Sequence, residues 1–152
     1  MNNYSTRLRV GFVAAALLAG GCGGDDGDDG GGGGAANKAE WQKRHASAVS
    51  VVSDGIDRSV EALNAGQRPV VLSECTQLKD DLAEARKAVP APDAAVDAAL
   101  RSALDATSTA VGTCVEGARI ASEAAIVEKA QREMKVARER YDAAEGAIEA
   151  WQ

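Results

Sequence analysis

Residues 71–93 read VLSECTQLKDDLAEARKAVPAPD, and this stretch holds a helical repeat together with its interruption. Apolar or small side chains recur in it at alternating steps of four and three residues: Val71, Cys75, Leu78, Leu82, Ala85 and Val89. This spacing places them on one face of an α-helix. Pro90 and Pro92 end the pattern, because proline cannot continue a helix. The stretch therefore predicts an amphipathic helix followed by a turn.

The same spacing occurs in three further segments. The first carries Trp41, His45, Ala48, Val52, Ile56, Ser59, Val60 and Leu63 and stops at Ala65-Gly66; Pro69 suits the first turn of the next helix. The third carries Val96, Leu100, Ala103, Thr107, Ala110 or Val111, and Cys114. The last carries Val127, Ala130, Met134, Ala137, Tyr141, Ala144, Ile148 and Trp151.

Four amphipathic helices with short links predict an all-α, antiparallel up-down four-helix bundle over residues 37–152. The helical phase is lost between Gly117 and Val127, where we expect the third turn. If Gly117 instead lies inside a continuous helix, the body is a three-helix bundle. In the four-helix form Trp41 and Trp151 share one end of the bundle and are expected to pack together. The last helix could pack within the chain or against a second copy.

The composition favours the same fold class. Aromatic residues make up 3% of the chain, and the body's apolar content comes mainly from alanine, the best helix former. The net charge is −6. Removal of a leader peptide with Arg7 and Arg9 would make the net charge about −8, and four aspartates at positions 25–29 supply half of that negative charge. An acidic body with interspersed charges argues against a nucleic-acid partner.

Residues 1–21 have a basic start, an apolar run from Val10 to Leu18, and small residues before Cys22. The run is too short to span a bilayer as a helix, which needs about 20 apolar residues. The segment resembles a bacterial lipoprotein signal peptide, although Ala19 stands where the lipobox usually has leucine. This resemblance implies that Cys22 is lipidated and anchors the protein to the extracytoplasmic face of the cell membrane. The alternative is an ordinary secretory signal without lipid.

Residues 22–36 are rich in glycine and aspartate and predict a disordered, flexible tether with a reach of roughly 20 Å. Asp25, Asp26, Asp28 and Asp29 also permit a calcium-loop interpretation. A solvated, self-repelling tether is the favoured interpretation, because the segment has no closing glutamate and no scaffold.

The two remaining cysteines, Cys75 and Cys114, fall on core-facing positions of adjacent predicted helices. In an exported protein we expect them to form a disulfide, against the alternative of two buried free thiols. A symmetric hairpin would offset them by about 10 Å, so the third helix must start late or be shifted along its axis. Nothing resembles a redox-active Cys-x-x-Cys pair.

No catalytic or metal-binding constellation can be assembled from the sequence. His45 has no identifiable nucleophile or orienting partner, and no His, Cys or Glu cluster has metal-ligand spacing. The charges of the last segment are expected to pair along its surface as Glu128–Arg132, Lys129–Glu133 and Lys135–Glu139. We therefore predict no enzyme activity and no cofactor.

The central stretch shows Cys75-x-x-Leu78, Ala85-Arg86, Pro90-x-Pro92-Asp93 and Cys114-x-x-Gly117 in order. In this it resembles small, uncharacterised helical lipoproteins and secreted proteins of actinobacteria, whose two cysteines bracket a Pro-Asp turn. The resemblance supports pairing of Cys75 with Cys114 and a turn after Gly117. No activity comes with it.

These features predict a membrane-anchored lipoprotein that acts as a non-enzymatic interaction module of the cell envelope, with an envelope protein as its partner. The alternative is a bundle that binds a small ligand between its helices. Three apolar residues off the core stripe are predicted to be exposed and to contribute to a partner surface: Val49, Val51 and Val70.

Overall fold

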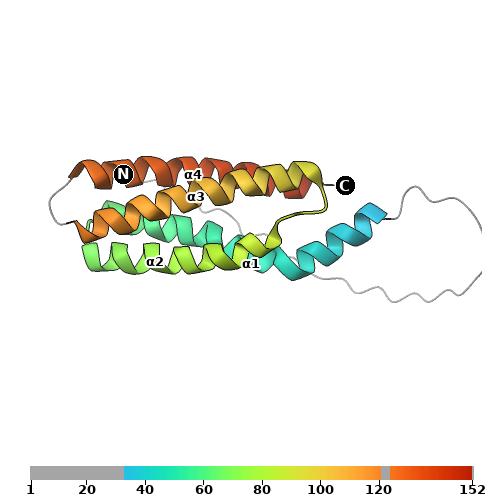
Figure 1. Ribbon diagram of the computed structural model, residues 1–152, viewed down its shortest axis with the longest axis horizontal. Coiled ribbons are helices and arrows are strands. Elements are labelled where there is room, and N and C mark those ends of the chain that lie inside the picture. The colour runs from blue at the N-terminus through green and yellow to red at the C-terminus, as the bar shows by residue number, and fades with distance from the viewer. Residues whose placement is uncertain (1–32, 121–123, 152) are drawn as a thin grey trace, which may run out of the picture.

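A computed structural model describes residues 33–120 and 124–151, with side chains from residue 37. It contains four helices, α1 (Gly33–Ala65), α2 (Arg68–Ala85), α3 (Ala94–Arg119) and α4 (Ala124–Ala150), and a short 3-10 helix, η1 (Arg86–Ala88). Figure 1 shows them packed side by side as a bundle, with the first turns of α1 projecting beyond the other helices. The predicted signal peptide, Cys22 and most of the predicted tether lie outside the described residues.

The predicted all-α four-helix architecture is confirmed, and the three-helix alternative is wrong. Consecutive helices are neighbours, and α1 also packs against α4, so the four form a closed ring. Gly117 lies within α3, but the helix ends two residues later at Arg119. A Cβ atom on Gly117 would approach Ile126 Cγ2 of α4 to 3.0 Å. Glycine therefore lets α3 and α4 approach closely just before the chain turns.

Local sequence explains where the helices begin and end. Gly66 follows α1 with φ of 68°, a left-handed conformation that glycine adopts without steric cost. Pro69 lies in the first turn of α2, as the sequence predicts. Asp93 caps α3, because its side chain accepts hydrogen bonds from the amides of Ala95 and Val96. The start of α1 at Gly33 is earlier than the expected domain boundary at residue 37.

The core follows the predicted stripes of α2 and α4. The fully buried positions include Cys75 and Leu78 of α2, Leu100 of α3, and Met134 and Tyr141 of α4. Alanines fill many of the remaining interior positions: Ala85, Ala88, Ala103, Ala110, Ala130, Ala137 and Ala144. Small side chains allow the helices to pack closely, as the alanine-rich composition predicts.

The prediction that Val49 is exposed is wrong: it is 4% exposed, whereas Val51 and Val70 are 39% and 42% exposed. The physical reason is that α1 contacts both α2 and α4 and so buries more than one narrow stripe. The hydroxyl of Tyr141 donates to the backbone carbonyl of Val49 at 2.9 Å. Val49 therefore belongs to the core and not to a partner surface.

Two of the three predicted ion pairs on α4 form. Arg132 lies 3.8 Å from Glu128, and Lys129 lies 3.6 Å from Glu133. The third, between Lys135 and Glu139, is absent from the ion pairs of the described residues. Exposed pairs of this type contribute little to stability, so the difference has no consequence for the fold.

Cys75 and Cys114 are paired in the structure, with their Cα atoms 6.2 Å apart. Cys114 lies about 30 Å into α3, whereas Cys75 lies only about 21 Å before the end of η1. The link of residues 89–93 supplies the difference of about 9 Å, since five extended residues can span up to about 16 Å. Figure 1 shows this link running past the end of α2 before α3 begins. The shift along the axis is thus made by the link, and α3 itself starts directly after it, at Ala94.

Candidate functional site

The two tryptophans meet at one end of the bundle, as the helix order predicts. The ring centroids of Trp41 and Trp151 are 5.7 Å apart in an edge-to-face arrangement, and both side chains are buried. The indole nitrogen of Trp41 donates to the carbonyl of Ala88 at 3.0 Å. The ammonium group of Lys38 donates to the carbonyl of Trp151. Trp41 therefore joins α1 to the end of α4 and to the end of η1.

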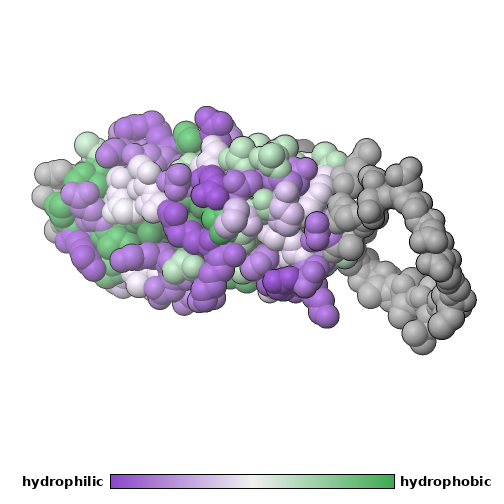
Figure 2. Space-filling view, turned by 45° about the vertical axis from the view of Figure 1, so that its right-hand side comes forward, coloured by the Kyte–Doolittle hydropathy of each residue, from purple (hydrophilic) through white to green (hydrophobic). Residues whose placement is uncertain are grey.

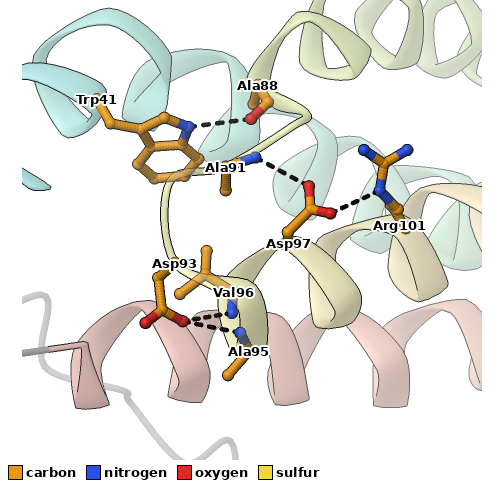
Figure 3. A network of polar contacts seen from close by, with 8 residues as sticks. All are labelled: Trp41, Ala88, Ala91, Asp93, Ala95, Val96, Asp97 and Arg101. Carbon is orange, nitrogen blue, oxygen red and sulfur yellow. Dashed lines mark hydrogen bonds and ion pairs between the residues drawn. The ribbon is translucent and has the colours of Figure 1, made fainter. Parts of the chain in front are cut away.

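The link between η1 and α3 is ordered by a set of polar contacts beside Trp41 (Figure 3). The amide of Ala91 donates to Asp97 Oδ1 at 2.9 Å, and Arg101 Nε donates to Asp97 Oδ2 at 2.8 Å. The hydrogen bond from Arg101 and, to a smaller extent, the one from the Ala91 amide hold the pKa of the half-buried Asp97 carboxyl below its usual value. Each contact fixes a residue of the link or the first turns of α3. The network is therefore structural.

The remaining predicted site residues have clear positions. His45 lies half-buried beside Trp41, with ring centroids 5.7 Å apart and planes tilted by 48°. Cys75 and Cys114 are both fully buried between α2 and α3. Cys22 lies outside the described residues, so its lipidation stays a prediction. Within the described ranges no three His, Cys, Asp or Glu side chains gather as metal ligands.

An open groove lies on the outer face of the α1–α2 hairpin, near its turn. Its volume is about 290 Å³. Ala62, Ala65 and Val70 give it apolar walls, and Arg58, Glu61 and Glu74 surround them with charges; we call these six residues the α1–α2 groove. Val70 is one of the large hydrophobic residues that the described surface exposes, together with Val51, Ile120 and Val136.

The charged rim of the groove is partly neutralised within the hairpin. Arg58 Nε donates to Glu74 at 3.1 Å, and a second nitrogen of Arg58 lies 3.7 Å from Asp81. Glu61 has no ion-pair partner within 4.0 Å among the described residues. The rim therefore has a net negative charge next to an exposed apolar side chain. This combination suits a segment that offers an apolar side chain beside a basic one.

A second space, an apolar cavity, lies at the same end of the bundle. Its volume is about 40 Å³, and its lining includes Leu63, Val71, Cys114, Val127 and Ala130. That volume is far below the roughly 300–1,000 Å³ of ligand pockets. The cavity therefore has the size of a packing defect. Figure 2 shows the strongest hydrophobic colour on the visible face near the end of the molecule opposite the projecting turns of α1.

Comparisons with protein-family models, with curated proteins and with solved structures give no significant match to this chain. Among the described helices, none combines the length and the apolar character needed to cross a membrane. The sequence singled out Val70, but not the residues around it, because the groove is formed by two helices whose relative rotation the periodicity does not specify.

Proposed function

We propose that this chain is a membrane-anchored extracytoplasmic lipoprotein whose helical bundle is a non-enzymatic interaction module of the cell envelope. The anchor is the lipid on Cys22, and the glycine- and aspartate-rich segment that follows it holds the bundle off the bilayer. The contact surface for the partner is the α1–α2 groove.

One observation carries this proposal: the exposed side chain of Val70 lies beside two alanines and is surrounded by charged residues. Val70 is 42% exposed at the start of α2, next to the groove formed with the last turns of α1. Covering the exposed part of the Val70 side chain in a complex is worth at most about 1.5 kcal/mol, and the surrounding charges orient the partner. The net negative rim supports a partner segment in which an apolar side chain neighbours a lysine or arginine.

The partner surface is tested by site-specific photo-cross-linking in intact cells. A photoreactive amino acid replaces Val70, and a matched variant carries it at Val136, which is 47% exposed on α4, a helix that contributes no residue to the groove. After detergent extraction, capture through a C-terminal tag and mass spectrometry, we expect one envelope protein to cross-link from position 70 only. Equal products from both positions, or the bare chain from both, would refute the groove as the contact surface.

Anchoring is tested separately. The Cys22→Ser variant removes the acceptor of the lipid, and metabolic labelling with an alkyne fatty acid reports lipidation directly. We expect the wild-type chain to be labelled and membrane-bound and the variant to be neither. A chain that labels equally in both forms, or stays in the membrane fraction without label, would contradict lipid anchoring at Cys22.

A further inference from the structure

The bundle consists of two tightly packed hairpins. In the first, α1 and α2 approach so closely at Gly55 that a Cβ atom there would lie 2.9 Å from Leu78 Cδ1. Arg58 of α1 also bridges to Glu74 and Asp81 of α2. In the second, α3 and α4 form the most extensive helix pair of the structure. Among the described residues, no side-chain hydrogen bond joins α3 to α4, so apolar packing holds this hairpin together.

The hairpins are joined covalently along one edge. The bond between Cys75 of α2 and Cys114 of α3 lies in the core, where both residues are fully buried. The guanidinium of Arg68 at the start of α2 adds a hydrogen bond to the carbonyl of Ala118 at 2.8 Å. This edge cannot separate while the disulfide is intact.

The opposite edge, between α1 and α4, is different. These helices share the fewest contacts of the four neighbouring pairs, and polar contacts line them from one end to the other. We call this edge the α1–α4 seam. Its polar contacts are Lys38 to the Trp151 carbonyl, Tyr141 to the Val49 carbonyl, Arg138 to Ser53 and Asp57, and Gln131 to Asn64. At one end the buried rings of Trp41 and Trp151 also pack across it.

Polar contacts separate at lower cost than apolar ones, because water replaces each lost hydrogen bond. The carbonyls of Val49 and Ser53 accept hydrogen bonds from α4 while both residues lie within the helix α1. They can keep their intrahelical bonds when α4 moves away. Separation of α1 from α4 exposes apolar side chains too, but separation of α3 from α4 would expose more, because that helix pair is the more extensive one.

We propose that the bundle opens as a clamshell along the α1–α4 seam, with the edge that carries the disulfide as its hinge. Each hairpin moves as a unit, and Cys75–Cys114 holds α2 and α3 together. Opening exposes the inner face of α4, where Met134 and Tyr141 are fully buried in the closed form. The fold thus permits a conformational change in which the α1–α2 hairpin moves relative to the α3–α4 hairpin.

The proposal is tested by measuring distances between spin labels on the full-length mature chain with its disulfide intact. One label pair, at Val51 and Val136, reports on the seam, and another, at Lys79 and Ser108, spans α2 and α3. All four positions are exposed, so a label fits without disturbing the core. The buried disulfide is protected from exchange with the labelling reagent.

The seam is then weakened by the double substitution Tyr141→Phe and Arg138→Met. We expect a second, longer distance for the seam pair, with its population raised about tenfold over wild type, and an unchanged distance across α2 and α3. The control Arg58→Met, which removes contacts inside the first hairpin, leaves the seam distance unchanged.

Two results would overturn the proposal. One is a seam pair that keeps a single distance in the double variant. The other is equal broadening of both label pairs, since this indicates general loosening of the bundle. Replacement of Cys75 and Cys114 by alanine gives a further check, because the hinge pair must then lose its single distance as well.

Discussion

Removal of the disulfide gives the largest expected change in stability. The double substitution Cys75→Ala and Cys114→Ala opens a loop whose ends are separated by 39 residues in sequence. In the chain-entropy description, closing a loop of this length is worth about 4 kcal/mol, because the cross-link restricts the unfolded chain. Alanine is the suitable replacement, since both positions are fully buried and a serine hydroxyl there would lack a partner.

The assay is guanidinium unfolding followed by far-UV circular dichroism, with a thermal scan alongside. We expect the free energy of unfolding to fall by about 4 kcal/mol, and the midpoint temperature of a bundle of this size to fall by roughly 15 °C. Wild-type protein treated with a strong reductant in the unfolded state is the control and must show the same loss. A loss below about 1 kcal/mol in both forms would refute the reasoning that the bond restricts the unfolded chain.

Three further predictions concern single residues. Tyr141→Phe removes the hydrogen bond to the Val49 carbonyl and should cost about 1 kcal/mol. Burial also raises the pKa of Tyr141, so above about pH 10 the unfolded chain ionises first and the stability of the wild type should fall. Denaturant titrations of the variant should lack this fall. Asp93→Ala removes the cap of α3 and should cost about 1 kcal/mol in thermal unfolding. The control Asp105→Ala loses only an exposed ion pair and should change stability little. Equal losses in the two variants would contradict the role of the cap. Gly66→Ala should destabilise by about 1 kcal/mol because of its positive φ. Gly146→Ala should stabilise by about 0.5–1 kcal/mol, because this glycine lies inside α4 and a Cβ atom added there would meet no other part of the described structure within 4 Å. The same sign for both in chemical denaturation would rule this explanation out.

Periodicity predicted the fold well because α2 and α4 each bury one face. The alternating steps in α2 and α4 correctly identified Leu78, Leu82, Met134 and Tyr141 as core residues. The antiparallel order of four helices correctly predicted that Trp41 meets Trp151. The core prediction depends only on the spacing of residues along one helix. The tryptophan prediction depends only on the alternating up and down direction of successive helices.

Other features depend on how two elements are placed relative to each other, and the sequence did not reveal them. The exposure of Val49 was misjudged because α1 contacts two neighbours. The helix shift that brings Cys75 to Cys114 is produced by an irregular link, whose path periodicity does not describe. A buried tyrosine needs an acceptor for its hydroxyl, so a hydrogen bond from Tyr141 could be expected from the sequence. Its partner could not, because the acceptor is the backbone carbonyl of Val49, and every residue has a backbone carbonyl.

The pairing of Trp41 with Trp151 has a consequence for spectroscopy. These are the two tryptophans of the chain, so its intrinsic fluorescence arises from a single end of the bundle. An emission change therefore reports separation of α1 from the C-terminal residues, whereas circular dichroism averages over every helix. Coincident curves from the two signals would indicate that both ends melt together, and an earlier fluorescence transition would indicate that the tryptophan end melts first.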